Sequence, residues 1–496
     1  MNLAALLQDI SLPADAAWQR LEVRGLEYDS RRVEPGFVFF AFPGSRTSGA
    51  LYARQAVERG AVAVVSELEA PADFPAPWIR VEHGRRALAL MSLRLYGNPG
   101  RRLRLTGVTG TNGKTTTVFA IDSMLRHAGR TTGMAGTVLY RIGQRESAAV
   151  NTTPESLDLV RMMDELERAG GTDFLFEVSS HALALERVYG FQFHTAVFTN
   201  FTQDHLDFHG TMEDYFAAKQ RLFTGAGGPP PRFAILNADD PWSERIVTAR
   251  ETARWTYGVN GDAQFRAEDI DAGFHGVRFT LRHGQGRTRI ESPLCGLFNV
   301  YNLAAAFATG VSLGLEPEAA AAGLAACKAV PGRFERVDMG QPFLVVVDYA
   351  HTEDALKNLI EAARALSPRR VLTVFGCGGD RDKLKRPRMG ETAAALSDFV
   401  VVTSDNPRSE NPLEIVNDIL VGVRRRDTPH ETEPDRRAAI RLAIGRASAG
   451  DIVLIAGKGH ETYQVLADRT IPFDDREVAR EVLAEFGYGE PRGGSS

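Results

Sequence analysis

The chain has 496 residues and carries 58 Lys and Arg against 63 Asp and Glu, a formal net charge of −5. That length indicates about three domains, because single hydrophobic cores stop growing near roughly 250–300 residues. The charge balance gives no electrostatic basis for binding nucleic acid, and no stretch is apolar enough to enter a membrane. The three scattered cysteines, Cys295, Cys327 and Cys377, form neither a disulfide framework nor a zinc site, so we expect a cytoplasmic protein.

The predicted elements describe an α/β protein with three domains. Residues 1–99 form a small α/β domain, with strands at 36–42 and 61–65 around a helix at 52–58. Residues 100–330 form a central P-loop-type doubly wound sheet, with buried strands at 174–178, 195–199 and 233–236. Residues 331–496 form a Rossmann-like C-terminal domain, with strands at 343–348, 370–375, 400–403 and 452–455. Segments rich in Gly and Pro mark both boundaries, at 97–100 and 330–333.

The most informative segment runs from Leu105 to Thr117, where a short apolar strand enters a Gly-rich turn and then a helix. Gly110 and Gly113 let backbone N–H groups approach phosphate oxygens, Lys114 adds a charge, and Thr115 offers a hydroxyl to Mg²⁺. The strict phosphate-loop pattern would need a glycine at position 108, which is valine. The alternative is an ordinary Gly-rich turn before a helix. We interpret the segment as a nucleotide phosphate site.

Acidic and imidazole side chains follow two further strands of the central domain. Glu177 ends a buried strand, a position from which it can reach a Mg²⁺ near Thr115. His205 and His209 lie with two carboxylates in the segment 200–210, just past another strand end. A strand-end acid exposed to water and structural histidines are the plainer alternatives.

Taken together, these motifs resemble the ATP-dependent Mur ligase family of peptidoglycan precursor synthesis, which is also similar to folylpolyglutamate synthases. The shared signature is Gly-Thr-Asn-Gly-Lys-Thr, Glu-Val-Ser-Ser-His and Asp-His-Leu-Asp-Phe-His-Gly, and the resemblance covers essentially the whole chain. Further matches at 151–154, 204–207 and 217–219 narrow it to the branch that adds the third amino acid to UDP-N-acetylmuramoyl-L-alanyl-D-glutamate.

The resemblance implies a set of catalytic, metal and ATP-binding residues. It makes Lys219 a lysine that carries CO₂ as a carbamate near Mg²⁺, although a lysine in this sequence context is more often a solvated helix residue. The implied catalytic residues are Lys114, Glu177, His205 and Lys219, and the implied metal ligands are Thr115, Glu177, His205 and carbamoylated Lys219. The implied ATP contacts are Gly110, Thr111, Asn112, Gly113, Lys114, Thr115, Thr116, Asn302, Arg333 and Asp348. On sequence alone, an N-cap role for Asp348 is an equally good interpretation.

The resemblance also implies which residues hold the UDP-linked substrate. In the first domain, the segment 28–32 by itself indicates only a polar turn before a strand. The implied substrate contacts are Ser30, Ser45, Arg46, Thr47, Asn151, Thr152, Thr153, Ser179 and Arg187. Ser48 and Leu185 depart from the family's pattern, so position 185 is left out of the site.

The segment Asp405-Asn-Pro-Arg408 resembles the form that the family uses for meso-diaminopimelate. The distal carboxylate of diaminopimelate can accept two parallel N–H bonds from an arginine, whereas lysine would present only a cation, which Arg408 would repel. The implied pocket consists of Arg381, Asp405, Asn406, Pro407, Arg408, Gly457 and Glu461. The Gly-rich turn at 376–383 is interpreted as a carboxylate-recognition loop, although each of these motifs taken alone is a plain turn.

The sequence therefore predicts an enzyme that ligates diaminopimelate to the D-glutamate of UDP-N-acetylmuramoyl-L-alanyl-D-glutamate, with Mg²⁺ and ATP and through an acyl phosphate. The predicted partners are these three substrates, without nucleic acid or membrane insertion, and the predicted state is a monomer. A lysine-adding relative and a folylpolyglutamate synthase are the rivals among enzymes. A nucleotide-binding switch without ligase chemistry is the rival of another class.

Overall fold

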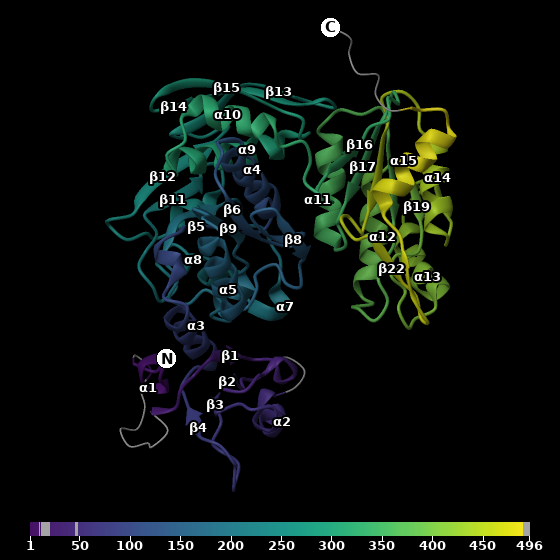
Figure 1. The fold of residues 1–496 in the computed structure, drawn as a ribbon. Coiled ribbons are helices and arrows are strands. Elements are labelled where there is room, and N and C mark those ends of the chain that lie inside the picture. Colours follow the sequence, from purple (N-terminus) through teal and green to yellow (C-terminus); the bar gives the residue numbers. More distant parts are fainter. Residues whose placement is uncertain (9, 11–19, 45–47, 490–496) are drawn as a thin grey trace. The chain divides into compact units, whose positions relative to one another are not determined.

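The computed structural model describes residues 1–8, 10, 20–44 and 48–489, and the chain forms two compact units (Figure 1). The first unit comprises Met1–Arg266 with Ala305–Gly323, and the second comprises Ala267–Ala304 with Leu324–Ser496. This division into two units does not test the predicted domain boundaries at 99 and 330, which stay predictions. Within the described ranges, none of the helices has the length and apolarity needed to cross a bilayer.

The first unit begins with a parallel sheet of strands β1 (Gly25–Glu27), β2 (Phe37–Phe40), β3 (Ala63–Ser66) and β4 (Trp78–Arg80), in that order. Apolar residues of β2 alternate between two cores, because Val38 and Phe40 face one and Phe39 faces the other. The helical segments here are α1 (Leu3–Leu6), η2 (Ser30–Arg32), η3 (Gly49–Tyr52), α2 (Ala53–Glu58), α3 (Gly84–Leu95) and η4 (Pro99–Arg101). The predicted strands and helix of this region are confirmed.

The same unit contains a larger sheet whose order runs β12-β11-β10-β5-β9-β6-β7-β8. Its parallel strands are β5 (Arg104–Thr109), β6 (Thr132–Ala135), β9 (Asp173–Glu177), β10 (Phe193–Phe198), β11 (Phe233–Asn237) and β12 (Ala253–Gly258). Strand β5 lies between β9 and β10, so the polar segments that follow these three strands meet at one edge of the sheet. The associated helices are α4 (Lys114–His127), α5 (Ser156–Arg168), α6 (Ser180–Ala184), α7 (Leu206–His209), α8 (Met212–Gln220) and η5 (Pro241–Arg245).

Further strands, of which one pairs parallel with β12 and the others form antiparallel pairs, occur in places where the sequence predicted none. Strands β7 (Leu139–Ile142) and β8 (Arg145–Ala148) form a hairpin on β6. Strand β13 (Phe265–Gly273) pairs with β12 at its start, and β14 (Gly276–His283) and β15 (Gly286–Ser292) form an antiparallel pair. In β14, Val277, Phe279 and Leu281 alternate with polar residues, so the sequence carried a strand signal that was missed, whereas β8 is exposed throughout and carries none. Helices α9 (Leu297–Ser312) and α10 (Pro317–Ala325) follow, as the Ala-rich segment predicted.

The second unit contains a sheet of order β16-β17-β21-β18-β19-β20 with helices on both faces (Figure 1). The strands are β16 (Glu335–Val337), β17 (Leu344–Asp348), β18 (Val371–Phe375), β19 (Phe399–Val402), β20 (His430–Thr432) and β21 (Ile452–Ala456). Helices α11 (Glu353–Arg364), α12 (Lys385–Leu396) and α13 (Pro412–Val423) pack on one face, and α14 (Arg436–Arg446) and α15 (Asp475–Glu485) pack on the other. A short hairpin, β22 (Tyr463–Val465) with β23 (Thr470–Pro472), completes the unit. The predicted Rossmann-like arrangement and the α/β fold class are confirmed.

Candidate active site

Strand β5 delivers a loop in which glycine is required at position 110. The φ angle of Gly110 is +141°, and a Cβ at this position would lie 1.9 Å from Thr199 Oγ1 and 3.0 Å from the carbonyl oxygen of Asn200. The loop after β10 therefore presses directly against the loop after β5. Gly113, with a φ of 85°, then turns the chain into α4, whose N-terminal amides point at the loop.

Two side chains of the loop after β10 hold the phosphate loop in place. Thr199 Oγ1 donates to the carbonyl oxygen of Asn112 at 2.6 Å, and the amide of Asn200 donates to the same oxygen at 3.1 Å. Asn200 Oδ1 accepts from the N–H of Asn112 at 2.9 Å. The backbone of the loop is thus fixed by hydrogen bonds before any phosphate binds.

Two lysines reach the carbonyl groups of this loop. Lys114 Nζ donates to the carbonyl oxygens of Gly110 at 3.1 Å and Thr111 at 2.7 Å. Lys219 Nζ, from α8, donates to the carbonyl oxygen of Gly110 at 2.7 Å. Burial, and then the positive charge of Lys114, lower the pKa of Lys219 well below its ordinary value. The side chain of Lys219 is only 2% exposed, and this burial favours the neutral form of its amine.

Glu177 lies at the end of β9 with its carboxylate directed at the phosphate loop. Its Oε1 accepts from Thr115 Oγ1 at 2.9 Å and from the N–H of Thr137 at 2.8 Å, and its Oε2 accepts from Thr137 Oγ1 at 3.2 Å. A Cβ on Gly136 would lie 2.5 Å from Oε1, which explains the glycine there. The predicted pairing of a hydroxyl with a strand-end carboxylate is present, and both are hard oxygen ligands of the kind Mg²⁺ takes.

His181 in α6, after β9, and His205 and His209, after β10, form a cluster of three imidazoles. The ring of His181 lies 4.8 Å from that of His205 and 5.5 Å from that of His209. Burial, followed by the charges of Lys114 and Lys219, lowers the pKa of His205, although Asp204 at 3.3 Å opposes this. Among the residues the structure describes, no three His, Cys, Asp or Glu side chains form a metal cluster. The predicted ligand set thus remains a prediction, and it would need the carbamate on Lys219.

The predicted substrate segment 151–153 contacts the same strand end. Thr153 Oγ1 donates to the carbonyl oxygen of Glu177 at 2.8 Å and accepts from the N–H of Ser179 at 3.0 Å. Thr152 Oγ1 lies 3.1 Å from Thr137 Oγ1. Arg187 donates to the carbonyl oxygen of Thr153 at 3.0 Å. These predicted residues are therefore assembled beside the phosphate loop.

The other predicted substrate residues make no such contact with the end of β9, or they lie outside the residues that the structure describes. Asn151 is exposed, and its backbone is tied to the hydroxyl of Tyr140, which donates to its carbonyl oxygen at 2.6 Å. Ser30, in η2, donates to Gln55 Oε1 at 2.8 Å. Ser45, Arg46 and Thr47 lie outside the described residues.

In the second unit, the predicted ATP contacts Asp348 and Arg333 lie close together at the end of β17. The Asp348 carboxylate accepts from the N–H groups of Phe334 at 2.7 Å and Ala350 at 2.8 Å, and burial raises its pKa. The N-cap of α11 is Thr352, so the alternative N-cap role for Asp348 is wrong. Asn302 lies in α9, where its amide donates to Asn299 Oδ1 at 3.0 Å.

Arg408 belongs to a pair of loops pressed backbone to backbone. Cβ atoms would lie 2.4 Å from the carbonyl oxygen of Thr403 if added to Gly376, and 1.9 Å from that of Pro407 if added to Gly379. Arg408 has a φ of 51°, an unusual conformation for a non-glycine residue, and donates to the carbonyl oxygen of Gly379 at 2.8 Å. A Cβ on Gly378 would lie 2.9 Å from the Arg408 guanidinium and 3.9 Å from Arg381 Cγ. The two predicted arginines thus flank one glycine turn.

The remaining predicted residues of the amino acid pocket are assembled next to Arg408. Asn406 Nδ2 donates to Glu461 Oε2 at 2.8 Å. A Cβ on Gly457 would lie 2.6 Å from Asp405 Oδ2, so this glycine admits the carboxylate. The structure therefore brings together residues from two loops that are 52 or more positions apart in the chain.

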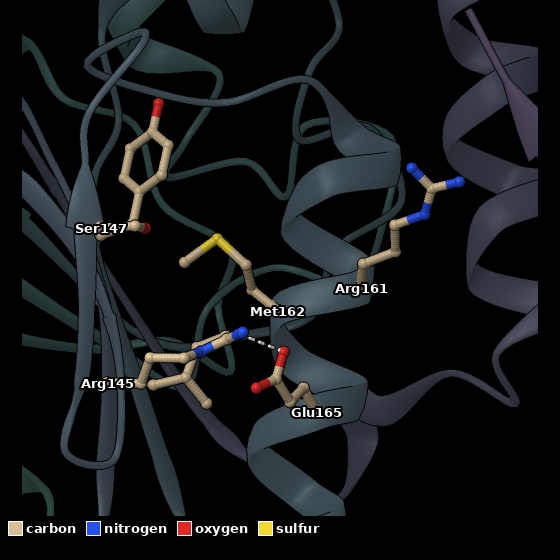
Figure 2. A pocket seen from close by; sticks show the side chains of 7 residues that line it. Arg145, Ser147, Arg161, Met162 and Glu165 are labelled. Carbon is tan, nitrogen blue, oxygen red and sulfur yellow. Dashed lines mark hydrogen bonds and ion pairs between the residues drawn. The ribbon is translucent and has the colours of Figure 1, made fainter. Parts of the chain in front are cut away.

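A cavity of about 130 Å³ lies elsewhere in the first unit, between the β7–β8 hairpin and α5 (Figure 2). An ion pair between Arg145 and Glu165, at 2.5 Å, closes one side of it. None of the predicted site residues lines it, so we do not assign it to the reaction. Its lining consists of Tyr140, Ile142, Arg145, Ser147, Arg161, Met162 and Glu165.

Sequence reasoning missed several residues that hold the site together. Thr137, Thr199 and Tyr140 hydrogen-bond to site residues that lie 40, 87 and 11 positions away, respectively, and no local motif marks them. Lys458 was not predicted either, although it lies between the predicted pocket residues Gly457 and Glu461. A lysine between two glycines directly after an apolar strand is a signal that could have identified it.

The phosphate loop at the edge of a doubly wound sheet, with a carboxylate and a second lysine directed at it, defines a nucleotide-dependent α/β enzyme of the phosphate-loop class. Comparison with known families gives matches to the Mur ligase family catalytic domain over residues 22–96, the Mur ligase middle domain over 108–310 and the Mur ligase glutamate ligase domain over 332–459. The chain belongs to the Mur ligase family, whose members are ATP-dependent ligases that form amide bonds in peptidoglycan precursor synthesis.

Individual relatives agree over almost the full length. The UDP-N-acetylmuramoyl-L-alanyl-D-glutamate--2,6-diaminopimelate ligase of Solibacter usitatus (strain Ellin6076) is 62% identical over 490 residues, which cover 98% of this chain and 99% of the relative. The ligase of the same name from Geobacillus thermodenitrificans (strain NG80-2) is 48% identical, covering 94% and 95%. A solved structure of a UDP-N-acetylmuramoyl-L-alanyl-D-glutamate--2,6-diaminopimelate ligase matches with a TM-score of 0.70 and 32% identity, covering 98% of this chain and 100% of that one.

Proposed function

We propose that the chain joins meso-2,6-diaminopimelate to the D-glutamyl carboxylate of UDP-N-acetylmuramoyl-L-alanyl-D-glutamate in an ATP-dependent reaction. The relatives that carry the name of this activity support the substrates. The observation that carries the choice of amino acid is the position of Arg408. Its backbone is held by a hydrogen bond to Val465, and its guanidinium lies beside Gly378, with Arg381 on the same turn.

This arrangement suits an amino acid with a distal carboxylate. A guanidinium can form two parallel N–H bonds to a carboxylate, each charge-assisted. Lysine as the incoming amino acid would leave Arg408 without that partner and would bring a second cation next to it. The acidic groups of Asp405 and Glu461, which lie close by, suit the ammonium groups of the same ligand.

In the proposed reaction, the γ-carboxylate of the D-glutamyl residue attacks the terminal phosphoryl group of ATP, which forms an acyl phosphate and releases ADP. The amine of diaminopimelate then attacks the acyl carbon, phosphate leaves, and the amine loses a proton. The N–H groups of the phosphate loop and Lys114 hold the phosphates, and Lys114 is already positioned at that loop. The hydrogen bond from the N–H of Ser179 to Thr153 Oγ1 holds residues 151–153, the proposed contacts of the UDP-linked substrate, at the end of β9.

The oxygens of Thr115 and Glu177, which lie 2.9 Å apart, are ligands of the kind that Mg²⁺ takes, and the resemblance adds His205 to the proposed ligand set. When bound, Mg²⁺ would offset negative charge on the transferring phosphoryl group. Lys219 would add a carboxylate there: its neutral amine attacks CO₂, a C–N bond forms, and one proton is released to leave a carbamate. The depressed pKa of Lys219 favours this step, because the neutral amine is the nucleophile. Labelling with ¹³C-bicarbonate tests it, since Lys219→Arg should lose a carbamate signal that the parent protein shows.

Phosphate release coupled to ligation tests the function. The protein should release phosphate with ATP, the UDP-linked dipeptide and diaminopimelate together, and lysine should support a much lower rate. Arg408→Ala should raise the KM for diaminopimelate at least about tenfold, the loss expected for a charge-assisted pair, without changing the KM for ATP. Arg424→Ala, at the exposed end of α13, is the matched control and should behave as the parent protein.

Two outcomes would contradict the proposal. Equal rates of phosphate release with lysine and with diaminopimelate would show that Arg408 does not select the amino acid, and would favour a lysine-adding ligase. Binding of ATP without phosphate release in the presence of any of these substrates would favour a nucleotide-binding switch.

A further inference from the structure

Lys458 is a fully buried cation whose ammonium contacts two residues of the proposed amino acid pocket. It follows β21 in the second unit, and its side chain is 0% exposed. Its Nζ donates to Asn406 Oδ1 at 3.2 Å and to Glu461 Oε2 at 3.1 Å. The ring of Tyr463 lies 5.6 Å from Nζ, on the hairpin that covers this region.

These contacts fix which way the Asn406 amide points. Asn406 Oδ1 accepts from Lys458 Nζ and from the N–H of Val465, at 2.9 Å for the latter, while Nδ2 donates to Glu461 Oε2. Both neighbours of Oδ1 are pure donors, so the amide oxygen cannot exchange places with the amide nitrogen. Without the ammonium, only the Val465 N–H would hold this orientation.

The same ammonium orients the Glu461 carboxylate. Oε2 of Glu461 receives hydrogen bonds from both Lys458 and Asn406, at 3.1 and 2.8 Å. Oε1 is engaged by neither donor, and it is the oxygen left to accept from an ammonium group of an incoming amino acid. Lys458 also balances the charge of Glu461, whose side chain is 17% exposed.

Stability alone gives little reason to bury this lysine. Removing an ammonium from water is costly, and a buried ion pair is often no better for stability than apolar residues of similar size. The adjacent buried arginine, Arg436, already has its own carboxylate partner in Asp475 at 2.7 Å. The contacts of Lys458 with two pocket residues are therefore its distinguishing feature.

We propose that Lys458 is a positioning residue for the incoming amino acid, which holds the Asn406 amide and the Glu461 carboxylate in the single arrangement that receives the ligand. This inference rests on the proposed function, because it assigns Asn406 and Glu461 to the amino acid pocket. Lys458 itself, buried beneath both, contacts the ligand only through them.

The variant Lys458→Met, whose unbranched side chain is one atom shorter and carries no charge, tests the proposal. The KM for diaminopimelate should rise at least about tenfold, as expected when a charge-assisted contact is lost. The KM values for ATP and for the UDP-linked dipeptide should stay within about twofold, since Lys458 Nζ donates to Asn406 and Glu461 and to none of the residues predicted to contact those two substrates. Lys357→Met, a change at an exposed lysine of α11, is the matched control and should leave all three constants unchanged.

A second variant separates positioning from stability. Ile440→Ala leaves a cavity in the core beneath α14 and should lower the melting temperature as Lys458→Met does, but Ile440 lies outside the proposed pocket. Its KM for diaminopimelate should therefore stay within about twofold of the parent value. A rise of that KM in Ile440→Ala as large as in Lys458→Met would overturn the positioning role, and so would an equal rise of the KM for ATP in Lys458→Met.

The outcomes distinguish this inference from the proposed function. If the parent protein does not release phosphate with diaminopimelate, the proposed function fails, and this inference fails with it. If the parent uses diaminopimelate and Lys458→Met has an unchanged KM for it, only the inference about Lys458 fails.

Discussion

Replacing Gly110 with alanine should disable the phosphate loop through two separate effects. The first is backbone strain, because the φ of +141° at this position is one that L-residues rarely adopt. The second is a collision, because the new Cβ would lie 1.9 Å from Thr199 Oγ1. That hydroxyl cannot simply rotate away without losing its hydrogen bond to the carbonyl oxygen of Asn112, at 2.6 Å.

The size of the effect follows from these two terms. A strained φ at a non-glycine residue costs about 1–3 kcal/mol. Losing the hydrogen bond between Thr199 and Asn112 adds about 0.5–1.5 kcal/mol. At about 1.4 kcal/mol per factor of ten, the sum lowers the population of the binding-competent loop by roughly tenfold to a thousandfold.

Calorimetric titration with ADP measures this loss directly, and circular dichroism verifies that the variant is folded. The matched control is Gly129→Ala, at the end of α4. Gly129 also has a positive φ, of +77°, but a Cβ there meets nothing within 4 Å. It should lose some stability through strain and keep its affinity for the nucleotide.

A Gly110→Ala variant that binds ADP as tightly as Gly129→Ala does would refute this reasoning. The double variant Gly110→Ala/Thr199→Ala examines the collision separately. It removes the contact at 1.9 Å and leaves the backbone of Asn200 at 3.0 and 3.1 Å, so it should recover part of the lost affinity. No recovery would mean that strain at residue 110 accounts for the whole effect.

Three further outcomes are expected. Arg436→Met breaks a buried ion pair with Asp475 and should lower the free energy of unfolding by about 3–5 kcal/mol in urea, whereas Arg436→Met/Asp475→Leu should lie close to the parent. Burial lowers the pKa of His194 from 6.5 to about 4, so the unfolded chain binds the extra proton between these values and stability falls as pH drops through that window. The urea midpoint of His194→Gln should consequently depend less on pH between 6.5 and 4 than that of the parent. Tyr140→Phe removes the hydroxyl that donates to the Asn151 carbonyl oxygen at 2.6 Å and should raise the KM for the UDP-linked dipeptide several-fold, with the KM for ATP unchanged.

The sequence predicted the candidate site best where its polar residues directly follow a buried strand. Glu177 and the phosphate loop follow buried parallel strands, and the carboxyl ends of such strands share one edge of the sheet, so their meeting could be foreseen. The contacts of Thr137, Tyr140 and Thr199 could not, because each joins segments separated by a turn or a crossover whose register no local pattern encodes. The β7–β8 hairpin was missed for a related reason, since its second strand is exposed throughout.

The structure shows a second reason for glycine in two loops, one in each unit. The sequence alone attributed Gly110 to the approach of phosphate and the turn at 376–379 to the recognition of a carboxylate. In both places the nearest obstacle to a Cβ belongs to another loop of the protein, Thr199 for Gly110 and Pro407 for Gly379. Glycine at 379 thus allows the backbone of Pro407 to pass at contact distance, which brings the next residue, Arg408, within 2.8 Å of the carbonyl oxygen of Gly379.

Because of this packing, the loop that contains Gly379 and the loop that contains Pro407 and Arg408 should move together. Any side chain larger than hydrogen at position 379 would push Pro407 away and would displace the guanidinium that follows it. Selection of the amino acid would then be lost although Arg408 itself is unchanged. The Gly-rich turn therefore helps to position Arg408. We expect the size of the residue at 379 to affect the choice of the incoming amino acid as directly as the charge at 408 does.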